Sequence, residues 1–147
     1  MGATYCTKSF NELTNSELYQ ILQLRSEVFV VEQNCIFQDI DNKDQESYHL
    51  LCRVDGILAG YTRLLAAGLS YDECAIGRVV TSPAFRGMGL GKELMEKSVE
   101  ACEKLFETTT IRIGAQRHLS KFYHSLGFVE SGEPYDEDGI LHIEMVR

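Results

Sequence analysis

Three glycines stand at every second position in the stretch "SPAFRGMGLGKELMEK", residues 82–97. Gly87, Gly89 and Gly91 lie where a helix-like pattern begins, although a glycine inside a helix costs roughly 0.8–1 kcal/mol relative to alanine. A strand, a glycine-rich turn and a helix build a backbone phosphate site, because unpaired amides and the helix dipole attract an anion there. Arg86 and Lys92 add positive charge. The stretch therefore predicts a phosphate-binding turn.

Two familiar phosphate motifs fail on spacing. A Walker A loop needs G-x-x-x-x-G-K-S/T, but Lys92 is followed by Glu93 and no glycine stands five residues before Gly91. A dinucleotide motif G-x-G-x-x-G that starts at Gly87 would need glycine at position 92, where lysine stands. The remaining alternative is a flexible loop that binds nothing. The regular spacing of the glycines and their direct connection to a well-patterned helix favour the phosphate site.

A second polar segment, "QNCIFQDIDNKDQES" (residues 33–47), carries Asp39, Asp41 and Asp44. Its carboxylates suggest a calcium loop, but the EF-hand template requires a glycine at its sixth position and a glutamate at its last, and both are absent. We interpret the segment as a solvated acidic loop and expect no metal. The alternative is that its carboxylates attract a cationic substrate.

The elements that position these residues follow from hydrophobic periodicity and turn residues. Thr14 and Glu17 form a predicted capping box ahead of a helix that runs to about Val31, and Arg25 and Glu32 fall on its otherwise apolar stripe. Strands are predicted at 3–9, 48–54, 57–65, 73–80, 110–116, 128–132 and 140–147, and further helices at 89–106 and 117–126. The order β-α-β-β-β-α-β-α-β-β indicates an α+β fold with a single mixed sheet flanked by helices.

Length and composition limit the class of protein. A chain of 147 residues predicts one domain over 1–147, and a net charge of −8 argues against a nucleic-acid surface. The five cysteines are scattered without any C-x-x-C pair, which indicates reduced thiols and no zinc site. Since no apolar run approaches the ~18 residues of a membrane span and the start lacks a signal core, we expect a cytoplasmic protein with no membrane partner.

The glycine stretch also resembles a family signature. "RGMGLG" is similar to the R/Q-x-x-G-x-G/A motif of the GCN5-related N-acetyltransferase (GNAT) superfamily, and "KFYHSLGF" (121–128) matches its late F-Y-x-x-x-G-F segment. "RSEVFVVEQ" (25–33), "AQRHLSKFY" (115–123) and "DGILHIEM" (138–145) resemble the narrower ElaA-type subset. Gln116 stands where many members of the superfamily carry asparagine, and the subset shows glutamine there. The resemblance covers nearly the whole chain and implies the mostly antiparallel acyl-CoA N-acyltransferase fold.

The resemblance further implies that acetyl-CoA is the acyl donor. In such a site a bent fourth strand offers backbone groups to the pantetheine arm and an amide to the thioester oxygen, the glycine turn holds the pyrophosphate, and Tyr123 protonates the departing sulfur. The alternative for Tyr123 is a core aromatic beside Phe122. The implied cofactor-binding residues are Val79, Val80, Thr81, Arg86, Gly87, Met88, Gly89, Leu90, Gly91, Lys92, Gln116 and Tyr123.

An acceptor amine must lose a proton before it attacks, since a lysine-like amine has a pKa of about 10.4. Glu32 and His49 are the candidates for this base, with His118 and His142 as weaker ones and an ordered water as a further alternative. Glu32 could equally form a structural ion pair, as could Arg25, and His49 could be a satisfied sheet histidine. The predicted acceptor contacts are Arg25, Glu32, Asp41 and Arg78.

Three functions remain open at this level. The first is an acetyl-CoA-dependent N-acetyltransferase that acts on a primary amine of a small molecule or peptide by direct attack. The second is a non-catalytic acyl-CoA sensor, and the third is an enzyme similar to acyl-homoserine-lactone synthases, which "RSEVFVVEQ" also resembles. A homodimer is compatible with the resemblance. We predict that Gly89→Val or Gly91→Val abolishes CoA binding while the fold stays intact.

Overall fold

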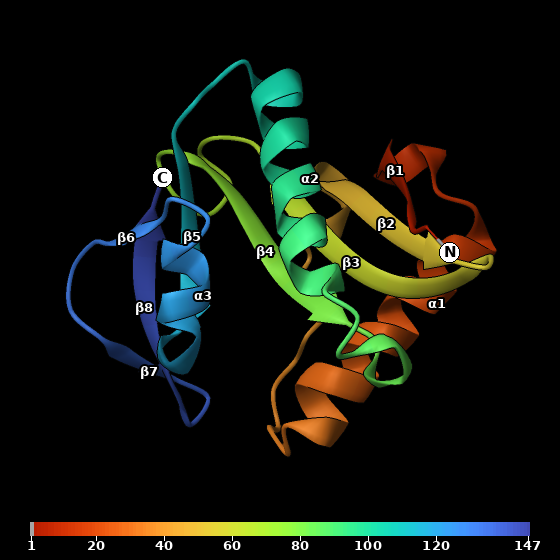
Figure 1. Ribbon diagram of the computed structural model, residues 1–147, viewed down its shortest axis with the longest axis horizontal. Coiled ribbons are helices and arrows are strands. Elements are labelled where there is room, and N and C mark those ends of the chain that lie inside the picture. Colours follow the sequence, from red (N-terminus) through yellow and green to blue (C-terminus); the bar gives the residue numbers. More distant parts are fainter. Residues whose placement is uncertain (1) are drawn as a thin grey trace.

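The computed structural model describes residues 2–147 and contains one central sheet with helices on both faces (Figure 1). The strands are β1 (Thr4–Ser9), β2 (Tyr48–Val54), β3 (Ile57–Leu65), β4 (Cys74–Thr81), β5 (Ile111–Gln116), β6 (Val129–Glu130), β7 (Tyr135–Glu137) and β8 (Ile140–Val146). The α-helices are α1 (Asn15–Arg25), α2 (Leu90–Phe106) and α3 (Ser120–His124). Short 3-10 turns lie at Phe10–Glu12, Asp44–Glu46, Pro83–Phe85 and Arg117–Leu119, and a π-helix spans Ser26–Glu32.

The strand order is β1-β2-β3-β4-β5-β8-β6, and β7 pairs with β8 outside this path. Every pairing is antiparallel except that between β4 and β5. The predicted mixed, mostly antiparallel α+β fold is therefore confirmed.

Two apolar cores lie on opposite faces of the sheet, because successive side chains of a strand point to opposite faces. On one face Leu50 of β2 belongs to the larger core, which includes Leu94 and Met95 of α2. On the other face Leu51 packs in a second core with Ile21 of α1. The sheet is thus covered by α2 and α3 on one face and by α1 and the segment that follows it on the other.

The pairing of β4 with β5 is confined to Cys74 with Ile111 and Ala75 with Arg112. Beyond these residues the two strands diverge, and Figure 1 shows them separating toward the end of the sheet where α2 begins. The edge of β4 from residue 76 onward therefore faces a gap instead of a neighbouring strand. This gap determines where the candidate site lies.

Local signals in the sequence explain several boundaries. The predicted capping box of α1 is confirmed, because the Glu17 amide donates to Thr14 Oγ1 at 3.1 Å and the Thr14 amide donates to Glu17 Oε1 at 2.9 Å. The hairpin between β2 and β3 turns at Asp55 and Gly56, whose φ values of 51° and 78° match a type I′ turn.

Two elements differ from the prediction. The first helix ends as an α-helix at Arg25 and continues as a π-helix to Glu32, so Arg25 and Glu32 do not share the regular helical stripe that we expected. The acidic segment that starts at Tyr135 is strand β7, a strand that the sequence analysis did not predict. Asp138 and Gly139, with φ values of 53° and 86°, reverse the chain into β8.

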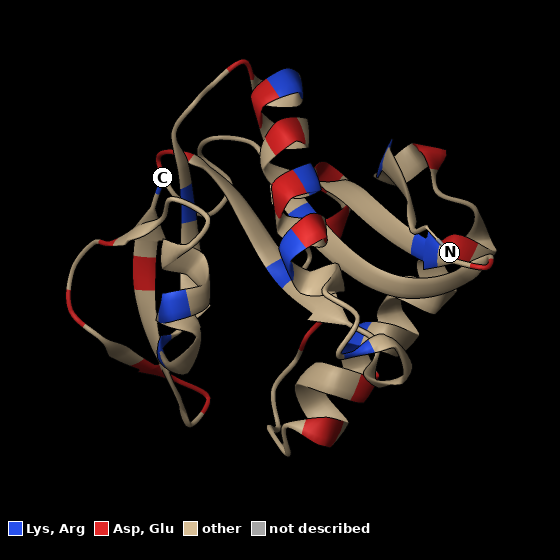
Figure 2. Ribbon diagram, in the orientation of Figure 1, with Lys and Arg blue, Asp and Glu red and all other residues tan. Residues whose placement is uncertain are grey.

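The outer face of α2 carries acidic and basic side chains in alternation (Figure 2), as expected of a solvated helix face. Among residues 2–147, no helix has both the length and the apolar composition that crossing a bilayer demands.

Candidate active site

A cavity of about 550 Å³ opens where β4 and β5 diverge. Val80 and Thr81 of β4, Arg86 of the glycine turn, Gln116 of β5 and Tyr123 of α3 all line it. Tyr123 of α3 and the pair Val28 and Phe29 beyond α1 come from opposite faces of the sheet, so elements of both faces line the cavity. Several of the predicted cofactor-binding residues are thereby brought together around one gap in the sheet.

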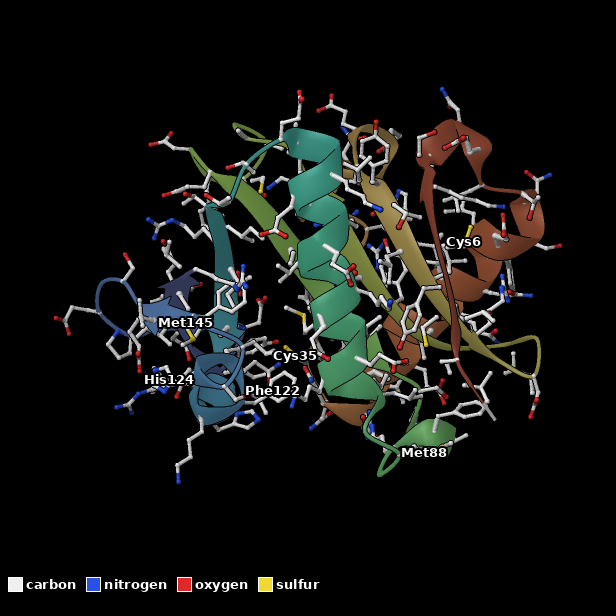
Figure 3. All side chains as sticks on the ribbon, turned by 45° about the horizontal axis from the view of Figure 1, so that its top comes forward. Cys6, Cys35, Met88, Phe122, His124 and Met145 are labelled. Atoms are coloured by element: carbon white, nitrogen blue, oxygen red, sulfur yellow. The ribbon has the colours of Figure 1, made fainter. Side chains whose placement is uncertain are left out.

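The glycine turn leads from β4 into α2 without any side-chain cap. Gly89 is the N-cap residue of α2 and has no side chain that could occupy the first amides, in contrast to Thr14 at the start of α1. The φ values of Gly87 and Gly89 are 81° and 73°, a region in which glycine carries no steric penalty. The first turn of α2 therefore presents its amides to any ligand that approaches (Met88 of this turn is labelled in Figure 3).

Unlike Gly87 and Gly89, Gly91 is not required by the backbone conformation. It lies inside α2 without a positive φ, and a Cβ built on it would be 3.9 Å from Phe122 Cζ, an ordinary contact distance. A small side chain at Gly91 therefore fits the fold itself. A valine at position 89 would be strained, because the φ of Gly89 is 73°. The structure therefore does not favour the prediction that Gly89→Val leaves the fold intact.

Glu32 and Arg86 form a bidentate ion pair with nitrogen–oxygen distances of 2.6 and 2.7 Å. The hydrogen bonds from Arg86 hold the pKa of the Glu32 carboxyl below its usual range. Both side chains are partly exposed, at 41% and 42%. Arg86 lines the cavity, whereas Glu32 contacts its guanidinium from the end of the π-helix. The pair links the segment after α1 to the glycine turn.

Tyr123 lies with its ring in edge contact with Phe122 and Phe128, at centroid distances of 5.1 and 6.1 Å. Only 6% of the residue is exposed, and burial raises the pKa of its phenol to about 12. Throughout residues 2–147 the Tyr123 hydroxyl has no hydrogen-bond partner. A protonated hydroxyl that is not engaged by the protein can donate to a ligand in the cavity.

His49 is fully buried and does not line the cavity. Its Nδ1 lies 2.6 Å from the Tyr61 hydroxyl and its Nε2 lies 2.9 Å from the Asp44 carbonyl oxygen. Burial lowers its pKa, so the imidazole is held neutral. This placement agrees with the alternative of a satisfied sheet histidine, because both ring nitrogens are engaged inside the protein.

Six charged side chains form one network, the Arg–Asp cluster, which consists of Arg25, Arg63, Arg78, Asp39, Asp41 and Asp44. Arg25 is fully buried and donates to Asp39 and Asp44 at 2.8 Å each. Asp39 and Asp44 are only 8% and 5% exposed. The prediction of a solvated acidic loop is therefore wrong: arginines from α1, β3 and β4 neutralise its carboxylates inside the protein.

Some residues of the Arg–Asp cluster also line the cavity. Asp41 and Arg78, two of the predicted acceptor contacts, line the cavity, whereas Arg25 does not. Arg78 has a φ of 50° at the irregularity where the register between β3 and β4 shifts. Its guanidinium donates to Asp39 Oδ1 at 2.8 Å and lies 5.8 Å from the centre of the Phe37 ring.

The β7–β8 hairpin contributes Tyr135 and Glu137, which the sequence analysis did not assign, and His142, which it named as a weaker candidate. All three line the cavity, together with Tyr71 from the loop before β4. A Cβ on Gly114 would lie 2.9 Å from the hydroxyls of both Tyr71 and Tyr135. Any side chain at position 114 would therefore force the two tyrosine hydroxyls to move away from β5. A glycine inside a strand often marks a place where other groups approach the backbone closely. Gly114 was therefore the one signal in the sequence for these tyrosines.

A family model described as an acetyltransferase (GNAT) domain matches residues 10–147. The chain belongs to the GNAT family. This GNAT chain is 45% identical over 139 residues to protein ElaA of Escherichia coli, with 93% of this chain and 91% of ElaA covered. It also superimposes with a TM-score of 0.94, at 44% identity, on the crystal structure of an acyl-CoA N-acyltransferase from Pseudomonas aeruginosa, which covers 99% of both chains.

The resemblance to ElaA-type GNAT proteins and the predicted acyl-CoA N-acyltransferase fold are thereby confirmed. The acyl-homoserine-lactone synthase LasI superimposes on this GNAT chain with a TM-score of 0.81 at 15% identity. At that identity the likeness shows a common fold only. Membership of the GNAT family implies an acyl-CoA as the acyl donor.

Proposed function

We propose that this GNAT protein transfers an acetyl group from acetyl-CoA to a primary amine by direct attack on the thioester. The observation that carries the proposal is the gap between β4 and β5, which is lined by Arg86 of the glycine turn and by Tyr123, whose hydroxyl is free. Residues 87–92, which form the uncapped start of α2, do not line the cavity themselves but follow directly on Arg86. The edge of β4 and the proton donor thus lie in one cavity, and the proposed pyrophosphate site lies next to it in sequence, after Arg86.

Each part of acetyl-CoA has a counterpart in the chain. The amides from Gly87 to Gly91 and the charges of Arg86 and Lys92 suit the pyrophosphate. The unpaired edge of β4 at Val79–Thr81 suits the amide groups of the pantetheine arm, since a strand edge offers both donors and acceptors. Gln116, which donates to Gln33 at a long 3.4 Å, lies across the gap from this edge.

The chemical step needs one nucleophile and one proton donor. The neutral amine nitrogen attacks the thioester carbonyl carbon, a C–N bond forms, and a backbone amide of β4 stabilises the negative charge on the oxygen. As the C–S bond breaks, the sulfur takes the proton of the Tyr123 hydroxyl. The nitrogen then releases one proton, which restores the Tyr123 hydroxyl and leaves a neutral amide. The phenol can supply that proton at neutral pH because burial keeps it protonated, with a pKa of about 12.

A calorimetric titration with acetyl-CoA, with ATP and desulfo-CoA as comparison ligands, tests the binding half of the proposal. Release of free CoA with a panel of primary amines tests the transfer half. We expect Tyr123→Phe to keep its affinity for acetyl-CoA while kcat falls about 100-fold, the usual scale of acid catalysis. Tyr19→Phe, at a 71% exposed tyrosine of α1, is the matched control.

Three results are informative. Binding and release together support the enzyme. Binding without release by any amine indicates an acyl-CoA sensor instead. No binding at millimolar acetyl-CoA contradicts the proposed function altogether.

A further inference from the structure

His142 is an imidazole that faces the cavity at the β7–β8 hairpin. It lies on β8 directly opposite Gln116 of β5, and both residues line the cavity. Its ring is 9% exposed and stacks on the ring of Tyr135 at a centroid distance of 5.8 Å and an angle of 28°. The packing fixes the orientation of the ring at the wall of the cavity.

The hydrogen bonds of His142 determine which nitrogen carries the proton. Nδ1 lies 2.8 Å from the carbonyl oxygen of Ile140. A carbonyl oxygen can only accept, so Nδ1 is the protonated nitrogen and Nε2 of the neutral ring keeps its lone pair. Nε2 lies 3.4 Å from Glu137 Oε2, close enough for that carboxylate to stabilise an imidazolium. The carboxylate therefore lies beside the nitrogen that would accept a proton, and the Ile140 carbonyl fixes the opposite nitrogen.

The charges around this imidazole suit a cation. Glu137 and Tyr135 contact His142 from β7, and from β5 it faces the neutral Gln116. Asp138 in the hairpin turn also lines the cavity, and its carbonyl accepts a hydrogen bond from Cys35 Sγ at 3.0 Å. The two hairpin carboxylates that line the cavity, those of Glu137 and Asp138, favour an ammonium group in the part of the cavity that His142 lines.

The two leading candidate bases, His49 and Glu32, are already engaged, and the weaker candidate His118 does not line the cavity. His49 lies outside the cavity with both ring nitrogens occupied, and Glu32 is bound by both terminal nitrogens of Arg86. We propose that one part of the cavity is the acceptor site for a primary ammonium group, a proposal that rests on the proposed amine transfer. This part is formed by Tyr71, Tyr135, Glu137 and His142. In it, His142 Nε2 accepts a proton from the ammonium group.

The proposed step balances with the transfer itself. The ammonium N–H bond breaks and its proton moves to His142 Nε2, while the N–H electron pair stays on the amine nitrogen. That pair forms the C–N bond, and the thiolate leaves with the proton of Tyr123. The nitrogen then gives its second proton to the Tyr123 phenolate, so the product is a neutral amide and the phenol is restored. The imidazolium, stabilised by Glu137, then returns its proton to solvent. No oxidant or metal is needed.

The test compares His142→Asn with His124→Asn. The asparagine amide at position 142 can still donate to the Ile140 carbonyl but cannot accept a proton at the site of Nε2. His124 on α3 (Figure 3) also contacts a glutamate, Glu130, but lies outside the cavity, so it is a matched control. CoA release is measured with n-propylamine from pH 6 to pH 9, and acetyl-CoA affinity is measured by calorimetry.

We expect His142→Asn to lower kcat/KM for n-propylamine about 100-fold or more and to remove the acid limb of the pH profile, with acetyl-CoA affinity unchanged. His124→Asn should behave as the unmodified protein. A loss in His142→Asn below threefold, or an unchanged acid limb, overturns the assignment. If the unmodified protein does not bind acetyl-CoA, the result instead contradicts the proposed function.

A second measurement applies even if n-propylamine is not turned over. The imidazole nitrogens of the acetyl-CoA complex are observed by ¹⁵N NMR while n-propylamine is added. We expect a protonated Nδ1 and an unprotonated Nε2 at His142, and a shift of Nε2 when the amine binds. An Nε2-protonated ring, or no response of His142 to the amine, overturns the acceptor site.

Discussion

Replacing Arg25 by methionine tests whether this buried arginine is structural, as its contacts indicate, or a contact for the acceptor. Arg25 is fully buried and donates to Asp39 Oδ2 and Asp44 Oδ1 at 2.8 Å each and to the Asp39 carbonyl at 3.2 Å. Methionine keeps much of the apolar volume of the side chain but donates no hydrogen bond. The two carboxylates then lose one partner each inside the protein.

The expected loss in the free energy of unfolding follows from these bonds. A buried hydrogen bond to a charged group contributes about 1.5–3 kcal/mol, so two of them contribute about 3–6 kcal/mol. Asp39 keeps Arg78 at 2.8 Å and Asp44 keeps Arg63 at 2.9 Å, which places the loss near the lower end. We therefore expect a loss of about 3 kcal/mol, or roughly 6–12 °C in Tm for a domain of this size.

Urea unfolding followed by circular dichroism measures this loss, since the chain has no tryptophan. Arg53→Met is the matched control: Arg53 lies on β2, is partly exposed and pairs with Glu17 at 3.7 Å, so it should cost less than about 1 kcal/mol. A loss below 1 kcal/mol for Arg25→Met, or one equal to that of Arg53→Met, would refute the structural role.

Three further predictions follow from the site. Gly91→Val should keep the fold, because a Cβ there meets only ordinary contacts, and should weaken acetyl-CoA binding at least tenfold in a calorimetric titration; an affinity equal to that of Lys97→Val would contradict this. Glu32→Gln should leave kcat within threefold and acetyl-CoA binding equal or tighter, because it frees Arg86; a 100-fold fall in kcat at unchanged affinity would make Glu32 the base. Burial opposes ionisation of Asp41, but the hydrogen bonds from Arg63 outweigh it and hold the Asp41 pKa below its usual range. The stabilisation by ionised Asp41 is thus present above about pH 4 and lost as pH falls toward the folded pKa, so the stability gap to Asp41→Asn should shrink between pH 7 and pH 3 in urea unfolding.

Much of the fold could be predicted from local signals. The bounds predicted for β2 and β3 agree with the structure, because alternating apolar residues flank a dipeptide, Asp55-Gly56, that favours a type I′ turn. The glycine turn could also be predicted, because glycine readily adopts the positive φ values that Gly87 and Gly89 have in the structure.

Contacts distant in sequence could not be predicted in the same way. Asp39 and Asp44 look like solvated residues until arginines from three separate elements converge on them. β7 is short, acidic and largely exposed, so its strand conformation depends on pairing with β8 and not on its own composition. The position of His142 at the cavity depends on that same pairing, which is why sequence alone ranked it low.

Backbone amide spectra recorded during an acetyl-CoA titration of ¹⁵N-labelled protein test the central claim most directly. The account predicts that the largest shifts occur at Gly87–Lys92, where the pyrophosphate would contact the uncapped turn of α2, and at Val79–Thr81 on the unpaired edge of β4. The capped first turn of α1 should not respond. Saturable binding with no shift at either segment would contradict the claim that the gap between β4 and β5 is the acyl-CoA site.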